Sequence, residues 1–192
     1  MKVKGLDHIA IIGTGMIGAS LATLFTGNGY KTTMLAVNEK EAKSGKDKYD
    51  ANFKDLIEKG LAIETQKEAC AKLLDVTQKY EDIAEADFIY ECVIENLEAK
   101  RSVYAQLEKN CGQVKAIASS SSAISADDLA EGFDRLRDKF LVAHPFNPPH
   151  LVPLVEILKS RYTSDEAAAT LIAALESTGR KIAVMKKSAP GF

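Results

Sequence analysis

The sequence predicts an α/β fold in which a doubly wound, mostly parallel sheet carries helices on its faces. Short apolar runs rich in β-branched residues alternate with longer segments of helical period along the chain. This order is typical of parallel strands joined by helical crossovers. A glycine-rich turn follows the first apolar run and opens the first helical segment. Ligands of such sheets bind at the carboxyl ends of the strands, so we expect the chemistry of this chain at that edge.

The first strand is expected at residues 6–12, and the first helix follows the glycine turn at residues 17–26. Gly27 and Gly29 end this helix, because glycine tolerates the left-handed conformation found at helix ends. The next apolar run predicts a second strand at residues 32–36.

A charged segment of helical period covers residues 39–74 and is interrupted at Gly60, which predicts a helical pair, or arm, inserted after the second strand. Further apolar runs predict strands at residues 76–77, 88–93, 117–118, 140–143, 155–158 and 181–184. Helical patterns predict helices at residues 97–110, at 126–136 behind a Ser125–Asp128 capping box, and from a Thr163–Glu166 cap to Thr178, closed by Gly179.

Composition limits the classes of partner. The 192 residues are 46% hydrophobic and 27% charged with a net charge of −2, which predicts one domain over residues 1–192 and neither nucleic acid nor a membrane surface as partner. No stretch approaches the roughly 20 apolar residues that span a bilayer, and no signal pattern opens the chain. Cys70, Cys92 and Cys111 are widely spaced and odd in number. We therefore expect buried thiols in the reducing cytoplasm, without metal or disulfide.

Residues 13–18 read GTGMIG and fit the GxGxxG pattern of dinucleotide-binding (Rossmann) folds in the context that this pattern requires, between a strand and a helix. Gly13 would permit the tight turn, Gly15 the approach of a pyrophosphate, and Gly18 the close packing of helix on sheet. Met16 and Ile17 lie at the helix start and are expected to meet the same cofactor. A glycine turn without a ligand is the alternative.

The acid that binds the adenosine ribose is expected at the end of the second strand, but Ala36 stands there. Glu39 could reach the ribose from one turn later, or Asn38 could make a neutral contact. Loss of a carboxylate also removes repulsion toward a 2′-phosphate, so NADP stays open. Only Lys40 is close enough to pair with such a phosphate, and we favour NAD.

Two further segments follow predicted strands. Glu95 and Lys100 could contact the nicotinamide ribose, although acids at a helix start also complement the helix dipole. Ser119 to Ser122 offer hydroxyl donors to a carbonyl or carbinol oxygen, although serine runs are also common turn material.

A histidine, His144, precedes a loop rich in proline, and the next apolar run carries one acid, Glu156. Proline fixes φ and makes such a loop stiff. A titratable base on a rigid turn beside a carboxylate is the layout of an oriented general base. The alternative is a strand-end histidine beside a surface acid. His150 in the loop is expected to be exposed, and His8 in the first strand to be structural.

Together these residues resemble the NAD-binding domain of the 3-hydroxyacyl-CoA dehydrogenase family over essentially the whole chain. The resemblance is carried by GTGMIG, by ECVIENLEAK at 91–100, by the serine turn, by HPFNPPHLVPLVEI at 144–157 and by PGF at 190–192. It implies that His144 is the general base, that Glu156 orients it, and that Ser122 contacts the substrate oxygen. The positions that it implies for the cofactor are Gly13, Gly15, Met16, Ile17, Gly18, Asn38, Glu39, Glu95, Lys100, Ser122 and Asn147.

The resemblance implies an oxidoreductase of fatty acid metabolism that transfers a hydride between NAD and a 3-hydroxybutyryl-CoA-like alcohol. The arm at 39–74 would meet coenzyme A, although solvated helices look the same. The family's C-terminal helical domain, with a catalytic asparagine expected just past Phe192, is absent from these residues. The domain alone is therefore expected to be inactive, and a homodimer is expected when the helical domain is present.

Departures from the family pattern keep two alternatives open. The serine turn is Ser119-Ser120-Ser121-Ser122 in place of serine-asparagine-threonine-serine, and Pro145 follows the histidine where the family usually has phenylalanine. Both variants are similar to the branch with gulonate 3-dehydrogenase (lambda-crystallin) and carnitine dehydrogenase, which act on small hydroxy acids. An alternative of another class is a nucleotide-binding module without catalysis.

Overall fold

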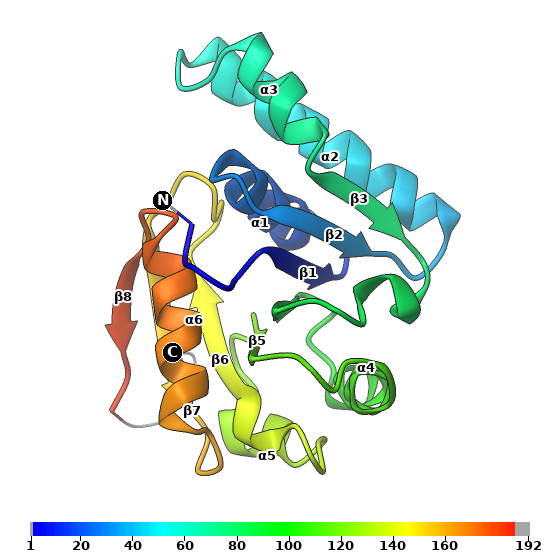
Figure 1. Cartoon of the computed structure of the whole chain (residues 1–192), viewed down its shortest axis with the longest axis vertical. Coiled ribbons are helices and arrows are strands. Elements are labelled where there is room, and N and C mark those ends of the chain that lie inside the picture. The colour runs from blue at the N-terminus through cyan, green and yellow to red at the C-terminus, as the bar shows by residue number, and fades with distance from the viewer. Residues whose placement is uncertain (1, 187–192) are drawn as a thin grey trace.

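The structure, a computed structural model, describes residues 2–186. Within them one eight-stranded sheet has the order β3-β2-β1-β4-β5-β6-β7-β8. Each neighbouring pair is parallel except β6 and β7, which are antiparallel. The predicted α/β class with a doubly wound, mostly parallel sheet is confirmed (Figure 1). The PGF sequence at 190–192 lies outside the described residues.

The elements have the following bounds. The strands are β1 (His8–Ile12), β2 (Lys31–Leu35), β3 (Leu74–Thr77), β4 (Phe88–Glu91), β5 (Ala116–Ser119), β6 (Phe140–Pro145), β7 (Leu154–Lys159) and β8 (Lys181–Val184). The α-helices are α1 (Met16–Gly27), α2 (Glu39–Glu58), α3 (Glu64–Ala71), α4 (Leu97–Asn110), α5 (Ala126–Ala130) and α6 (Asp165–Glu176). Two 3₁₀ turns, Tyr80–Ile83 and Arg137–Lys139, were not anticipated from the sequence.

Helices cover both faces of the sheet, and the alternation of strand residues explains why. Ile9 and Ile11 of β1 point into a core that α1, α2 and α6 share. Ala10 and Ile12, one residue apart from them, point into a second core with α4 and α5. Successive side chains of a strand face opposite ways, so an almost wholly apolar run is the pattern of a strand buried on both faces.

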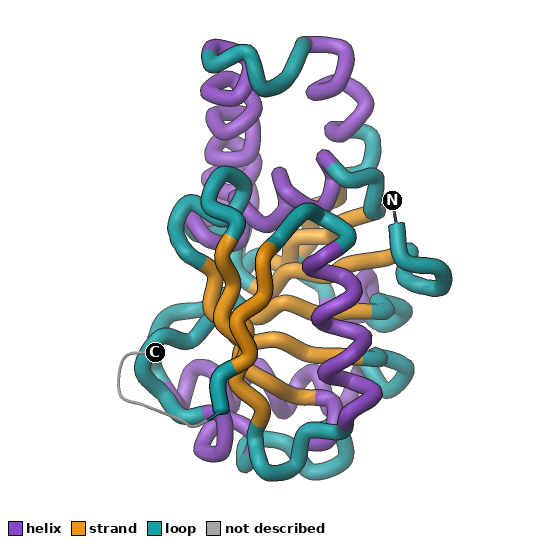
Figure 2. The backbone as a smooth tube through the Cα atoms, turned by 90° about the vertical axis from the view of Figure 1, so that its left-hand side faces the viewer, coloured by secondary structure: helices purple, strands orange, loops and turns teal. Residues whose placement is uncertain are grey.

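The predicted arm is present as the α2–α3 pair, which rises above one end of the sheet in Figure 2. Its base is tied to the glycine turn. The Thr14 hydroxyl donates to the Glu41 carbonyl at 2.9 Å. A Cβ added to Gly45 would lie 2.5 Å from Thr14 Cβ, so only glycine lets α2 approach this closely. No helix among residues 2–186 combines the length and the apolar character needed to cross a bilayer.

Two helix predictions were wrong at their ends. The helix expected at 126–136 is only α5, which ends where Gly132 packs against the Tyr104 ring. The cap of α6 is Ser164, whose side chain accepts from Ala167 N, because the Thr163 hydroxyl instead donates to the Phe140 carbonyl at 2.6 Å. The Ser125 cap of α5 is confirmed, with Asp128 N donating to its hydroxyl.

Candidate active site at the carboxyl edge of the sheet

The glycine turn between β1 and α1 has the geometry expected of each glycine. Gly13 has φ of +105°, and a Cβ there would lie 2.7 Å from the Cys92 carbonyl oxygen. A Cβ on Gly18 would lie 2.0 Å from the Gly13 carbonyl oxygen, so helix and turn are in direct backbone contact. At Gly15 nothing lies within 4 Å of an added Cβ. The turn is therefore closed at its first and third glycines and open at the second.

The open position is also the start of a helix. Gly15 is the N-cap of α1, and no side chain of the described residues caps it. No acid lies in the first helical turn, and Met16 is 63% exposed beside the opening. Backbone N–H groups at a helix start carry partial positive charge and bind anions. This turn therefore fits a pyrophosphate at the open side of Gly15, where a side-chain methyl group would lie in the way.

The end of β2 carries no carboxylate. Ala36 is buried and Val37 is exposed. The Asn38 side chain caps α2 by accepting from Glu41 N at 2.9 Å, which leaves its amide N–H groups as the donors toward a ribose. Glu39 is the first, exposed residue of α2. Both residues lie at the edge that the sequence predicted for them.

His144 and Glu156 are direct partners across the antiparallel β6–β7 pair. His144 Nδ1 lies 3.2 Å from Glu156 Oε2, and the two side chains are 20% and 18% exposed. From β4, on the far side of β5, the Tyr90 hydroxyl donates to the Ala143 carbonyl at 2.6 Å. The histidine is thus held through its ring nitrogen and through the backbone before it. The predicted pairing of base and acid is present in the structure.

The proline-rich loop after β6 is attached to α1, which the sequence did not indicate. His150 is half-buried, and its Nδ1 lies 2.5 Å from the Ser20 hydroxyl. The expectation that His150 is exposed was therefore wrong. Burial is the main cause that lowers its pKa. Asn147 is exposed, and its side-chain amide lies 3.7 Å from Met16 Sδ, so the loop and the helix start are neighbours at the same edge.

The serine turn after β5 is organised by Glu95. One carboxylate oxygen, Oε1, accepts from the Ser121 hydroxyl at 2.6 Å and from Ser122 N at 2.9 Å. It also accepts from the two following amides, Ala123 N and Ile124 N. Partial burial alone would raise the pKa of Glu95, but the hydrogen bonds and the nearby Lys100 together lower it. Ser122 itself is exposed at the site.

Lys100 occupies a different place from the one expected of a residue that touches the cofactor. Its side chain has no exposed surface, and Nζ lies 2.8 Å from Glu91 Oε1 and 3.5 Å from Glu95 Oε2. Of these two partners, Glu95 is the one that is partly exposed at the site. Sequence reasoning did not single out Glu91, although an acid that ends a four-residue apolar strand and a lysine nine residues later could have signalled it.

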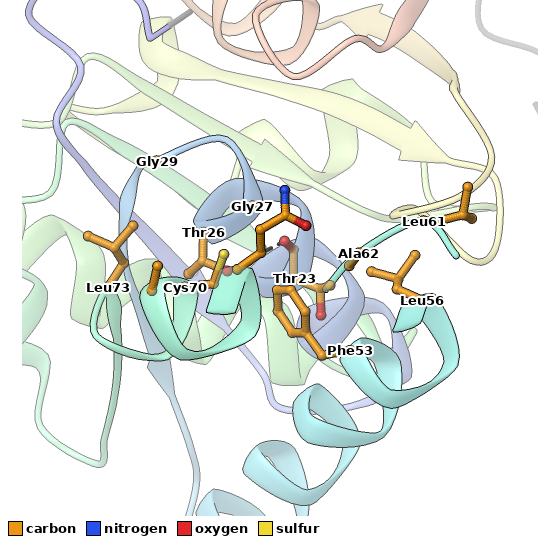
Figure 3. Close-up of a pocket in the computed structure, with 12 residues that line it drawn as sticks. Thr23, Thr26, Gly27, Gly29, Phe53, Leu56, Leu61, Ala62, Cys70 and Leu73 are labelled. Carbon is orange, nitrogen blue, oxygen red and sulfur yellow. Dashed lines mark hydrogen bonds between the residues drawn. The ribbon is translucent and has the colours of Figure 1, made fainter. Parts of the chain in front are cut away.

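A hollow of about 380 Å³ lies elsewhere, between the arm and the carboxyl end of α1 (Figure 3). Thr26, Gly29 and Leu73 line it, at the amino ends of β2 and β3. It is thus at the edge of the sheet opposite to the glycine turn. The candidate active site is the carboxyl edge of the sheet, where Gly15, His144, Glu156 and Ser122 lie.

The chain is similar to known proteins over almost its full length. The sequence model described as "3-hydroxyacyl-CoA dehydrogenase, NAD binding domain" matches residues 8–188. A peroxisomal fatty acid beta-oxidation multifunctional protein of Arabidopsis thaliana is 34% identical over 179 residues, which are 93% of this chain and 24% of that protein.

Solved structures give the same picture. That of (S)-3-hydroxybutyryl-CoA dehydrogenase from Ralstonia eutropha aligns with a TM-score of 0.92 and 26% identity, over 98% of this chain and 66% of that chain. A second, of 5-formyl-3-hydroxy-2-methylpyridine 4-carboxylic acid 5-dehydrogenase, described as an NAD+-dependent dismutase, aligns with a TM-score of 0.85 and 26% identity, over 97% of this chain and 60% of that chain. The chain spans about a quarter of the length of the curated relatives that it matches.

Proposed function

Since the chain belongs to the 3-hydroxyacyl-CoA dehydrogenase family through its NAD-binding domain, we propose that it transfers a hydride between NAD and a 3-hydroxyacyl-CoA-type secondary alcohol. The observation that carries the proposal is the His144–Glu156 pair, at 3.2 Å, on the same sheet edge as the open glycine turn. A base and a dinucleotide site at one edge are the two parts that alcohol oxidation needs.

The nicotinamide ring, when bound, supplies the hydride acceptor or donor. His144 accepts the hydroxyl proton in oxidation and returns it in reduction. Because Glu156 engages Nδ1, Nε2 is the nitrogen that exchanges this proton. Glu156 also stabilises the imidazolium that forms. The Ser122 hydroxyl donates to the same substrate oxygen and shares its developing negative charge.

The start of α1 would hold the pyrophosphate at Gly15, while Gly13 provides the tight turn and Gly18 the close packing of helix on turn. Asn38 and Glu39 would meet the adenosine ribose, and Asn147, beside Met16, would contact the cofactor at the start of α1. The absence of a carboxylate at Ala36 supports some tolerance of the 2′-phosphate of NADP, and Lys40 is the basic residue nearest to Ala36 in sequence. NAD is therefore the preferred cofactor.

Nucleotide binding and turnover test the proposal separately. Calorimetry on this chain should give tighter binding of NADH than of NADPH, and binding of neither would contradict the proposal. In the full-length protein, His144→Gln should lower turnover of 3-hydroxybutyryl-CoA by about a hundredfold or more, as loss of a general base does. NADH binding should stay unchanged. Normal turnover in that variant would remove His144 from the mechanism, and NADH binding with no turnover of any hydroxy substrate would favour a non-catalytic nucleotide-binding module.

A second substrate class has its own support. Pro145 replaces the phenylalanine usual after the family's histidine, and one structural relative acts, by its name, on a small carboxylated ring. Gulonate and carnitine are the test substrates for this alternative. A kcat/KM for either that exceeds the value for 3-hydroxybutyryl-CoA would decide for it.

The proposal includes the cellular compartment and the oligomeric state of the protein. Three free thiols at Cys70, Cys92 and Cys111 support a reducing compartment, the cytoplasm. A homodimer is proposed for the protein that includes the family's helical domain.

A further inference from the structure

The carboxylate of Glu91 is completely buried at the end of β4 and has a donor on every side. Oε1 accepts from Val93 N at 2.8 Å and from Lys100 Nζ at 2.8 Å. Oε2 accepts from the Tyr104 hydroxyl at 2.8 Å and from the Ser119 hydroxyl at 2.7 Å. These donors come from β4's following loop, from α4 and from β5. The carboxylate therefore joins three elements and leaves no oxygen to meet a ligand.

Lys100 connects this buried carboxylate to the site. Its ammonium group has no exposed surface and lies between Glu91 and Glu95. A buried charge is strongly unfavourable unless paired, and apolar residues of similar size often give equal or greater stability than a buried pair. A gain in fold stability therefore does not explain why this buried pair is present. Lys100 also contacts Glu95, the carboxylate that organises the serine turn, and this contact indicates a role in positioning that turn.

Glu95 connects Lys100 to the serine turn. Its Oε1 gathers the Ser121 hydroxyl and three consecutive amides, at Ser122, Ala123 and Ile124. The backbone of the turn is thus wrapped around one carboxylate oxygen. A displacement of Glu95 would move Ser122 with it.

We propose that Glu91, Lys100 and Tyr104 form a positioning unit that fixes Glu95 and, through it, the turn that carries Ser122. The importance of Ser122 rests on the proposed function, whereas the placement of the turn does not. Neither Glu91 nor Tyr104 touches the exposed edge, so both act only through other residues.

Tyr104 is a member of the unit that can be altered without changing its packing. Its ring stacks on Phe133 with centroids 4.4 Å apart, and only its hydroxyl reaches Glu91. Burial, together with the Glu91 charge, raises the pKa of Tyr104, so the hydroxyl stays a donor. Tyr104→Phe removes that one donor and keeps the ring.

Amide hydrogen exchange tests the proposal without any cofactor. The double variant Glu91→Gln/Lys100→Met has no unpaired buried charge and is expected to fold. Its amides at 122–124 should exchange about tenfold faster or more, since their acceptor loses its anchor. The amides of β4 and β5 should change much less. Tyr104→Phe should move the same amides in the same direction by a smaller factor, and Glu98→Gln, on the exposed side of α4, should leave them unchanged.

Unchanged exchange at 122–124 in the double variant would overturn the positioning role. If the double variant does not fold, Tyr104→Phe decides, and unchanged exchange there has the same consequence. A comparison of NADH affinity with ADP affinity then tests this inference separately from the proposed function. The double variant should weaken NADH by about tenfold and leave ADP, which lacks the nicotinamide ribose, unaffected. Equal weakening of both would indicate general loss of structure and overturn the inference, whereas a wild-type chain that binds neither contradicts the proposed function alone.

Discussion

Replacing Gly15 by alanine separates cofactor binding from folding. Gly15 has φ of −69° and ψ of −172°, an extended conformation that any residue adopts. Its added methyl group would contact nothing within 4 Å. Alanine gains roughly 0.4–1 kcal/mol by restricting the unfolded chain. Alanine is also a poorer helix N-cap than glycine, by roughly the same amount. The two effects have opposite signs, so the free energy of unfolding should stay within about 1 kcal/mol of wild type.

The same methyl group lies where the pyrophosphate is expected to approach the backbone. NADH affinity should therefore fall by about tenfold or more, which corresponds to at least about 1.4 kcal/mol of binding free energy. Chemical denaturation gives the first quantity and calorimetric titration with NADH gives the second. Gly18→Ala is the matched comparison. Its Cβ would lie 2.0 Å from the Gly13 carbonyl oxygen. Relief of that overlap should lower the free energy of unfolding by about 1–3 kcal/mol, and NADH affinity should fall as well.

Two results would refute this reasoning. Wild-type NADH affinity in Gly15→Ala would mean that no ligand enters the open side of the turn. A large loss of stability in Gly15→Ala would mean that the turn is packed against something at this position.

Three other outcomes follow from the structure. The folded-state pKa of Glu95 lies below its ordinary value of 4.5, so its contribution to the stability of the serine turn is present above that pH and is lost as the pH falls through the lower, folded pKa. Amide exchange of the serine turn, corrected for intrinsic rates, should therefore stay constant from pH 7 to about 5 and accelerate on further acidification. An equal acceleration in Glu95→Gln would contradict this prediction. Gly45→Ala places a Cβ 2.5 Å from Thr14 Cβ, so it should lower the melting temperature by several degrees, as a loss of about 1–2 kcal/mol does, whereas Gly27→Ala, with open space around it, should not. Ser20→Ala removes the hydroxyl partner of His150 and should speed proteolysis within the proline-rich loop with little change in the melting temperature; unchanged cleavage would show that other contacts hold the loop.

The sequence predicted the order of the elements because the central strands are short and apolar on both faces, and because segments of helical period separate most of the strands. The arm and its break at Gly60 were equally readable, since a glycine with φ of +69° ends the first helix of the pair. The ends of α5 and α6 were not. They depend on contacts between distant segments, such as the Thr163 hydroxyl with the Phe140 carbonyl, which no local pattern contains.

The same division applies to the site. The glycine turn and the His144–Glu156 pair were predictable because a motif and a hairpin keep their members close in sequence. The burial of Lys100 was not, because a lysine in the first turns of a charged helix looks exposed until Glu91 and Tyr104 are placed around it. His150 was mistaken for an exposed residue for a similar reason, as its partner Ser20 lies 130 residues away.

The reversed direction of β7 explains how one strand can orient the base. A parallel strand offers this edge only its last residues, as β6 does with His144, or the loop that follows it. β7 runs the opposite way and therefore brings a residue from within the strand, Glu156, beside His144. Backbone pairing with β6 and with β8 fixes its position. The orientation of the imidazole is therefore set by sheet register, whereas the position of Ser122 is set by a turn, which is why the turn needs the buried Glu91, Lys100 and Tyr104 behind it and the histidine does not.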